Sequence, residues 1–234
     1  MTTGIIGAME VEVESLVRSM DVSRTIERAG MRFLAGRLRG ADVVVVRSGV
    51  GKVSAGMCVQ VLVDEFDVDA VINTGVAGSL DNALGIGDIV VSTDAMYHDV
   101  DATAFGYAPG EIPQLGARSF PADEALRREA VSAAREAVSA AHVHEGRVVS
   151  GDQFVADEGT KARLAHDFSG MCCEMEGAAI AQACWLNGVP FVVVRAISDK
   201  ADGSGKVLYP VFERAAARHC AGIVERIAEA RAGE

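Results

Sequence analysis

The stretch VPFVVVRAISD, residues 189–199, is the most apolar strand-like run of the chain. Its apolar residues follow one another without the alternation of a strand that has one face in water, which is the pattern of a strand covered by helices on both sides. Two charged residues break this apolar pattern, Arg195 inside the run and Asp199 at its end. Charged side chains are seldom buried unless they pair with another group or have a functional role. We therefore expect both side chains to belong to a functional site at the rim of a sheet.

Similar runs recur along the chain and alternate with helical patterns. The strand-like runs are GIIGA (4–8), ADVVVVRSG (41–49), VDAVINTGVAG (68–78), GDIVVSTDAMYHD (87–99) and GRVVSGDQF (146–154). Helical spacing of apolar and charged residues occurs at about residues 9–20, 52–66, 121–141, 157–167, 174–187 and 208–231. This alternation predicts an α/β fold in which helices cover both faces of a largely parallel or mixed sheet.

Length and charge limit the possible classes of protein. The chain has 234 residues, half of them hydrophobic, which is enough for one sizeable core, and we expect a single domain over residues 1–234. The formal net charge of −11 disfavours binding to nucleic acid or to an anionic membrane surface. The N-terminal segment has no basic stretch that leads into an apolar one, and no run approaches the length needed to cross a bilayer. We therefore expect a cytoplasmic protein.

The cysteines and histidines do not form a metal-binding pattern. The five cysteines make no C-x-x-C pair and lie in mostly apolar surroundings, as reduced core residues do. The five histidines are scattered, and no H-E-x-x-H or His/Cys spacing typical of zinc occurs. We expect no metal.

Polar and small residues follow or end the strand-like runs. These loops read GAMEVE (7–12), SGVGK (48–52), NTGVAG (73–78), SGDQF (150–154), EMEG (174–177) and ISDK (197–200). Ligands bind at the strand ends of open α/β sheets. We therefore expect the six loops to share one crevice.

The glycines of RSGVGKVSAG, residues 47–56, follow a strand but do not make a loop for nucleotide phosphates. The P-loop pattern requires a glycine at Val46 and a hydroxyl at Val53, and the dinucleotide pattern requires a glycine at Ser54. The segment therefore predicts a tight turn from strand to helix, whose glycines let a ligand approach the backbone closely.

Among the carboxyls of the polar loops, those of Glu12, Glu176 and Asp199 are the candidates for chemistry. A place in the first turn of a helix, where acids favour the helix dipole, accounts for any one of the glutamates but not for Asp199 as well. In CCEMEGAAIA (172–181), Glu174 fits that structural role, and Glu176 is the better candidate to face a crevice. Carboxyls without a nucleophilic serine or cysteine suit cleavage of a glycosidic bond, in which an acid protonates the leaving group and a base activates water.

One long irregular segment, residues 98–120, reads HDVDATAFGYAPGEIPQLGARSF. It carries three glycines, two prolines and several aromatic residues. This composition is typical of a functional loop or a subunit contact and not of a linker between domains.

Seven segments in this order carry a resemblance that runs over nearly the whole chain. They are GIIGAMEVEV (4–13), SGVGKVSAG (48–56), VINTGVAGSL (71–80), GDIVVSTDAMYHDVDATAFGY (87–107), VSGDQFV (149–155), EMEGAAIAQ (174–182) and PFVVVRAISDKAD (190–202). The chain resembles the 5′-methylthioadenosine/S-adenosylhomocysteine nucleosidases, within the purine nucleoside phosphorylase superfamily. The resemblance implies a homodimer with a nucleoside phosphorylase-like fold, a three-layer α/β/α sandwich around a central mixed sheet. It also implies hydrolysis of the N-glycosidic bond of the two nucleosides to adenine and the 5′-thioribose product, with no cofactor.

The resemblance implies a role for each carboxyl. Asp199 would be the general acid that protonates N7 of adenine, oriented by Ser198. Glu12 would be the base for the attacking water, with Arg195 near it. Glu176 would hold the ribose hydroxyls.

The resemblance also implies the walls of the pocket. Phe154 would form an aromatic wall for adenine, the backbone of Val155 would contact the adenine edge, and Met175 would pack against the sugar. The remaining lining residues would be Met9, Val50, Ala77 and Gly78.

Four further positions concern the 5′ substituent and the water. Phe105 and Pro113 are implied to cross the dimer interface and to cover the 5′-alkylthio group in the other subunit's site. Tyr209 lies near the position of an aromatic residue that caps the thio group in relatives. Val76 is a departure, because it stands where some members have a serine that hydrogen-bonds the water.

Three other functions remain open from sequence. A phosphate-dependent nucleoside phosphorylase of the same fold would need cationic and amide donors for a dianion, whereas the first loop presents Glu10 and Glu12. A futalosine-type hydrolase would use the same residues for the purine and the ribose, so the sequence distinguishes it poorly from a nucleosidase for the two thio-nucleosides. A non-catalytic nucleoside sensor is disfavoured, since a binding module does not need an acid at the leaving group together with a base at the water.

Overall fold

The structure, a computed structural model, describes residues 1–137, 143–200 and 205–232, and of residues 205–211 it describes the backbone alone. The strands are β1 (Thr2–Gly7), β2 (Met20–Arg28), β3 (Met31–Leu38), β4 (Ala41–Arg47), β5 (Ala70–Ser79), β6 (Ile89–Tyr97), β7 (Phe120–Pro121), β8 (Val143–Ser150), β9 (Cys172–Glu174) and β10 (Phe191–Asp199). The helices are α1 (Glu10–Ser19), α2 (Lys52–Phe66), η1 (Thr103–Phe105, one turn of 3-10 helix), α3 (Glu124–Ala137), α4 (Glu158–Phe168), α5 (Gly177–Asn187) and α6 (Gly205–Arg231). The helices and the long buried strands follow the predicted order, and the strands β2, β3, β7 and β9 are additional.

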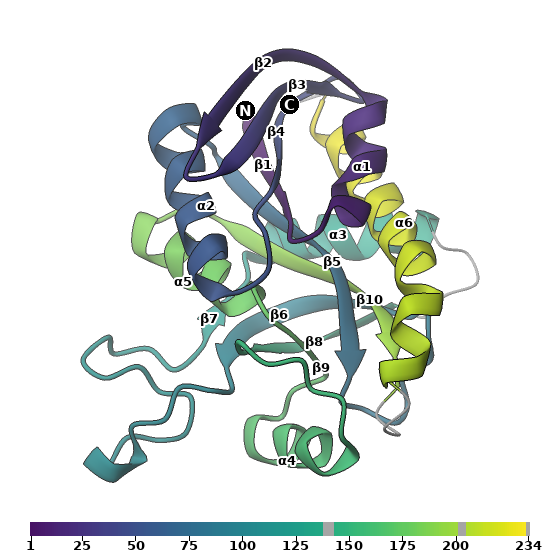
Figure 1. The fold of residues 1–234 in the computed structure, drawn as a ribbon. Coiled ribbons are helices and arrows are strands. Elements are labelled where there is room, and N and C mark those ends of the chain that lie inside the picture. Colours follow the sequence, from purple (N-terminus) through teal and green to yellow (C-terminus); the bar gives the residue numbers. More distant parts are fainter. Residues whose placement is uncertain (138–142, 201–204, 233–234) are drawn as a thin grey trace.

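The strands of the described residues form one mixed sheet (Figure 1). Strands β4, β1, β5 and β10 are neighbours in that order, and all three of these pairings are parallel. β10 also pairs with β6, and β5 with β9, both antiparallel. Because β6, β8 and β9 lead from β10 back to β5, this part of the sheet closes into a ring, while β1, β4, β3 and β2 extend from it as an open sheet.

Helices cover both faces of the sheet. Side chains of α1, α3 and α6 pack in one hydrophobic core and those of α2 and α5 in another. Figure 1 shows α2 and α5 on one side of the strands and α1 and α6 on the other. Alternate residues of β10 enter the two cores, Val192 and Val194 the first and Val193 the second, which explains the unbroken apolar run. The predicted three-layer α/β/α arrangement with a mixed sheet is confirmed.

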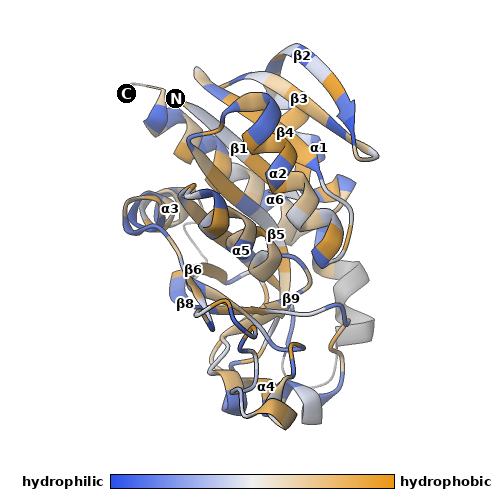
Figure 2. Ribbon diagram, turned by 90° about the vertical axis from the view of Figure 1, so that its left-hand side faces the viewer, coloured by the Kyte–Doolittle hydropathy of each residue, from blue (hydrophilic) through white to orange (hydrophobic). Residues whose placement is uncertain are grey.

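The outer hairpin of β2 and β3 is a feature that the sequence patterns missed. Arg28 pairs with Met31 across a two-residue turn, in which Ala29 and Gly30 have φ angles of +50° and +74°. Such positive φ values are typical of tight hairpins. Most side chains of β2 are exposed, and its ribbon carries stretches of hydrophilic colour in Figure 2. An edge strand of this kind lacks the apolar pattern by which buried strands are recognised.

Two other segments can be compared with what the sequence predicts for them. The helix expected from residue 174 begins at Gly177, because Glu174 belongs to the short strand β9. The segment 98–120 is irregular apart from η1 and the first residue of β7. Within the described residues, no helix combines the length and the apolar composition that a membrane crossing requires.

Candidate active site

The ends of β1, β4, β5 and β10 and the turns after β8 and β9 meet around one pocket. The space inside it, together with the open solvent at its mouth, is about 570 Å³. The lining residues are Ala8, Met9, Glu12, Val50, Val76, Ala77, Gly78, Gln153, Phe154, Val155, Cys173, Glu174, Met175, Glu176, Ser198 and Asp199. Every one of the six polar loops contributes to this list, so they do share one crevice.

Glu12 is held at the start of α1 by backbone amides. Its Oε2 accepts hydrogen bonds from the amides of Ala8 (2.7 Å) and Met9 (2.9 Å), and its Oε1 accepts one from Val76 (3.0 Å). Burial raises the pKa of Glu12, while the charge of Arg195 and the three amides offset part of the rise. A carboxylate with a fixed orientation and a raised pKa is suited to accept a proton.

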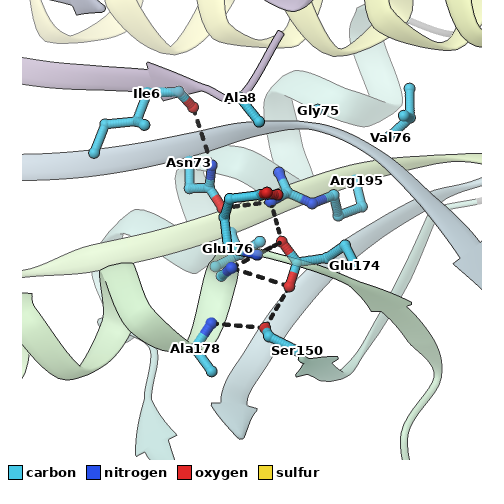
Figure 3. A network of polar contacts seen from close by, with 12 residues as sticks. Ile6, Ala8, Asn73, Gly75, Val76, Ser150, Glu174, Glu176, Ala178 and Arg195 are labelled. Carbon is cyan, nitrogen blue, oxygen red and sulfur yellow. Dashed lines mark hydrogen bonds and ion pairs between the residues drawn. The ribbon is translucent and has the colours of Figure 1, made fainter. Parts of the chain in front are cut away.

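Arg195 forms a buried ion pair with Glu174 beside the pocket (Figure 3). Its Nη2 donates to Oε2 of Glu174 and to Oδ1 of Asn73, each at 2.5 Å. Asn73 in turn donates to the carbonyl of Ile6 at 3.0 Å, which links β10, β5 and β1. Burial alone would lower the pKa of Arg195, but the charges of Glu174 and Glu12 raise it, so the guanidinium stays charged. Arg195 thus bonds to Glu174 directly and acts on Glu12 through its charge.

Glu174 is the centre of a hydrogen-bond network at the start of α5 (Figure 3). Besides the guanidinium, its carboxylate accepts hydrogen bonds from the hydroxyl of Ser150 and from the amides of Glu176 and Gly177. Ser150 itself accepts a hydrogen bond from the amide of Ala178 at 2.7 Å. The network fixes the turn that carries Glu176, which agrees with the structural role expected for Glu174.

Glu176 precedes the first residue of α5 and enters the pocket with little exposed surface. Its Oε1 accepts a hydrogen bond from the amide of Gly51 at 2.7 Å. Burial raises the pKa of Glu176 to about 8, and repulsion from Glu174 adds to that rise, while the Gly51 amide and Arg195 oppose it. The carboxyl can therefore carry a proton at neutral pH.

Replacing Glu176 by glutamine should change how stability depends on pH. Because the pKa rises from 4.5 to about 8 on folding, the stabilising effect of the bound proton is complete below pH 4.5 and is lost as pH rises through 8. Glu176→Gln removes this loss, so we expect it to be more stable than the unmodified chain at pH 8.5, by on the order of 3 kcal/mol, and near equal to it at pH 5. Thermal unfolding at both pH values measures the difference.

The matched control for this experiment is Glu10→Gln, which removes an exposed carboxyl at the start of α1. We expect the same small change in melting temperature at both pH values for this variant. A gain in stability from Glu176→Gln that is equal at pH 5 and pH 8.5 would contradict the assignment of a strongly raised pKa to Glu176.

Asp199 stands at the end of β10 and is 2% exposed. The hydroxyl of Ser198 lies 3.2 Å from Oδ1 of Asp199 and 3.3 Å from the carbonyl oxygen of Ala77, so its one proton can be donated to either. Gly78 approaches closely, since a Cβ at that position would lie 3.1 Å from Oδ2 of Asp199. Nζ of Lys161, from α4, donates to the same Oδ2 at 2.6 Å.

The expected walls of the pocket differ in their exposure. Phe154 and Val50 are 54% and 55% exposed, which places them at the mouth. Val155 is buried, and Met175 is intermediate. Met9 adds apolar surface next to Glu12.

Two residues that are expected to cover the other subunit's site do not line the pocket of their own chain. Phe105 is 85% exposed, and Pro113 is exposed as well. Neither of them is among the lining residues. The side chain of Tyr209 lies outside the part of the chain that the structure describes.

Some residues at the site were not found from sequence. Gln153 and Cys173 line the pocket, and Lys161 reaches Asp199 from behind it. Lys161 had a signal, because it shares the buried side of α4 with Leu164 and Phe168, three and seven positions further on. A cation in an otherwise apolar helical stripe indicates a buried partner.

The arrangement places carboxyls with different surroundings in one pocket. Glu12 is held by amides, and Asp199 is paired with a lysine. Carboxyls whose environments differ in this way can divide the roles of acid and base between them. No three His, Cys, Asp or Glu side chains are gathered as metal ligands within the described residues.

Comparisons with known proteins show similarity over nearly the whole chain. A model of the phosphorylase superfamily matches residues 2–229. A 5′-methylthioadenosine/S-adenosylhomocysteine nucleosidase of Shewanella sediminis is 45% identical over 233 residues, which cover 98% of this chain and 99% of that protein. The crystal structure of the nucleosidase of Neisseria meningitidis in complex with methylthio-immucillin-A has a TM-score of 0.93 at 40% identity and covers 98% of this chain and 99% of that one. A futalosine hydrolase of Helicobacter pylori has a TM-score of 0.90 at 33% identity, with coverage of 97% and 96%.

Proposed function

This chain belongs to the 5′-methylthioadenosine/S-adenosylhomocysteine nucleosidases of the phosphorylase superfamily, and from that membership we propose that it hydrolyses the N-glycosidic bond of both nucleosides. It is an N-glycosyl hydrolase, and its products are adenine and the 5′-thioribose sugar. The observation that carries the proposal is the presence of two buried carboxyls, Glu12 and Asp199, in the lining of one pocket.

In the proposed mechanism one carboxyl protonates the leaving base and the other activates the water that attacks the sugar. Asp199, beside Ser198, gives a proton to N7 of adenine, so that the base leaves as a neutral molecule. Glu12 takes a proton from the water that attacks C1′ of the sugar. The amides of β5 and of the turn after β1 hold the Glu12 carboxylate for this task.

The remaining lining residues are proposed to bind the substrate. Glu176 holds the ribose hydroxyls, and Met175 packs against the sugar. Phe154 covers the adenine ring, and the backbone of Val155 reaches its edge. The place of these four residues around one pocket supports their proposed roles.

Water, and not phosphate, is the proposed nucleophile. A phosphate dianion is usually bound by cations and amides. The nucleophile side of this pocket presents Glu12, and the described residues that line the pocket include no lysine or arginine. A carboxylate there repels phosphate and suits the activation of water.

The experiment that tests the function is adenine release from each nucleoside, with and without added phosphate, with identification of the sugar product. We expect free 5′-methylthioribose or S-ribosylhomocysteine at the same rate in both conditions. A sugar 1-phosphate, formed only with phosphate, would make the chain a phosphorylase. Futalosine serves as a third substrate, because the match to a futalosine hydrolase is also close, and release of the base from futalosine alone would replace the proposed substrates.

A homodimer is part of the proposal. The face of α2 and α5 exposes Val53 (75%), Met57 (48%) and Leu186 (60%), and a groove beside it is also lined by Ile112 of the long segment. Exposed apolar side chains that gather on one face support an interaction site there. In such a dimer Phe105 would cover the 5′ substituent in the other subunit's pocket. Light scattering should give twice the chain mass of 24.5 kDa, and a monomer would remove this part of the proposal.

A cytoplasmic location and a single domain also belong to the proposal. All five cysteines are buried free thiols, which fits a reducing compartment. The family match over residues 2–229 supports one unit.

A further inference from the structure

A buried lysine, Lys161, faces the proposed acid at the end of β10. Its Nζ donates to Oδ2 of Asp199 at 2.6 Å and to the carbonyl oxygen of Lys200 at 2.5 Å. Lys161 is 1% exposed and Asp199 is 2% exposed, so solvent does little to screen the two charges. Lys161 is not among the described residues that line the pocket. Any effect of Lys161 on a bound nucleoside therefore passes through Asp199.

The other charged and titratable groups near Asp199 do not take the place of this lysine. Cys173 of β9 faces the pair, but burial raises the pKa of its thiol to about 12, so it is neutral. Glu174 of β9 is an acid and already holds Arg195, the other buried cation of the site. Among the described residues, Lys161 is thus the one cation with a hydrogen bond to Asp199.

We propose that Lys161 is a positioning residue for the general acid of the reaction. It holds one oxygen of Asp199 and stabilises the negative charge that develops on this carboxyl as its proton passes to the purine. The inference rests on the proposed function. In the step, the bond from C1′ to the purine breaks and its electron pair goes to the base, N7 takes the proton of Asp199, and water adds hydroxide to C1′ and a proton to Glu12. Lys161 keeps all its protons.

The charge of Lys161 should affect catalysis, whereas a purely structural bridge between α4 and β10 would affect stability alone. A cation beside a carboxyl makes it a stronger acid and lets it lose its proton at lower pH. A stronger acid transfers its proton more completely in the transition state. The rate constant kcat and its pH profile therefore both report the proposed role, whereas loss of a structural bridge changes the melting temperature alone.

The test compares Lys161→Gln with the unmodified chain in steady-state assays of adenine release from pH 5 to pH 10. On the plateau below the alkaline limb we expect kcat to fall about 3- to 30-fold, and we expect the limb itself to move to higher pH. KM should stay within about twofold, because the lysine does not reach the pocket. The matched control is Arg163→Gln, an exposed cation of the same helix, and it should change neither quantity.

Two further variants make the outcome decisive. In an Asp199→Asn background, Lys161→Gln should cause no further loss of kcat, and a further loss of the same size as in the unmodified chain would overturn the proposal. Lys161→Arg keeps the charge, so its alkaline limb should stay at the original pH while kcat falls through the changed geometry. Should Lys161→Gln not fold, an alkaline limb of Lys161→Arg displaced to higher pH would be the contradicting result.

The inference and the proposed function can fail separately. An unmodified chain that releases no adenine overturns both. An unmodified chain that releases adenine, with a folded Lys161→Gln variant whose kcat and alkaline limb are unchanged, overturns the role of Lys161 alone.

Discussion

Asp199→Asn should lower kcat for adenine release by about 10²- to 10⁴-fold, the usual contribution of a general acid. The amide has the size of the carboxyl and keeps an oxygen that can accept the hydrogen bond now made by Lys161. It has no acidic proton for N7, so adenine must leave as an anion. Loss of the charge partner of a buried lysine also costs stability, about 3–5 kcal/mol for pairs of this kind, so the assay belongs well below the melting temperature.

A substrate that needs no protonated leaving group separates chemistry from folding in this variant. A 5′-methylthioribosyl compound with a nitrophenolate leaving group departs as a stable anion, so Asp199→Asn should cleave it at nearly the rate of the unmodified chain. Asp167→Asn, which removes an exposed carboxyl of α4, is the control and should cleave both substrates normally. Adenine release by Asp199→Asn at more than a tenth of the normal rate would remove the assignment of the acid.

Glu12→Gln should also lower kcat by about 10²- to 10⁴-fold, because the attacking water loses its base. In contrast to Asp199→Asn, it should lose activity on both the nucleosides and the nitrophenolate substrate, since both need the water. Binding of a non-cleavable nucleoside analogue should remain, as measured by calorimetry. Full activity of Glu12→Gln would show that the water is activated elsewhere.

The contacts of Glu12 predict an additional cost in stability. The carboxylate faces amide donors with both oxygens, Ala8 and Met9 on one side and Val76 on the other. A glutamine must turn its NH₂ group toward one side, so at least one N–H then lacks an acceptor, at a cost of about 1–3 kcal/mol. A lower melting temperature with intact binding of the analogue is therefore the expected pattern. Glu14→Gln on the same helix, where the carboxyl pairs with Arg18 at the surface, controls for the loss of a charge.

The contacts of Glu12 also show what the valine at position 76 changes and what it leaves unchanged. The family resemblance implies a serine hydroxyl in some members where Val76 stands, but it is the backbone amide of Val76 that bonds to Glu12. An amide is present whatever the side chain. The hold on the proposed base therefore does not depend on the residue at this position, and only the direct bond from a serine to the water is lost.

Much of the fold could be predicted because it depends on local patterns. Unbroken apolar runs such as residues 189–199 indicated strands covered on both faces, and helical spacing located α2 within residues 52–66. The hairpin of β2 and β3 escaped, since its exposed side chains carry no such pattern. The closure of the sheet through β9 escaped too, because a strand of only three residues leaves little signal.

Some features of the candidate site could likewise be predicted from the sequence, and others could not. The place of polar residues after strands identified the loops that line the pocket, and the family resemblance supplied the roles proposed for Glu12, Glu176 and Asp199. Phe105 and Pro113 lie outside the pocket of their own chain, and their proposed role concerns a second subunit. No pattern along the chain named the partners of the buried charges.

The amino-acid sequence by itself determined the order of the helices and of the long buried strands, the loops that form the crevice and the family to which the chain belongs, since periodicity and motifs are properties of neighbouring residues. Only the tertiary structure decided that Lys161 meets Asp199, 38 positions away, and that Arg195 meets Glu174, 21 positions away. Such pairings depend on which strands become neighbours and in what register. That choice is made by the packing of the whole chain, because it has to bury the apolar faces of every element at once.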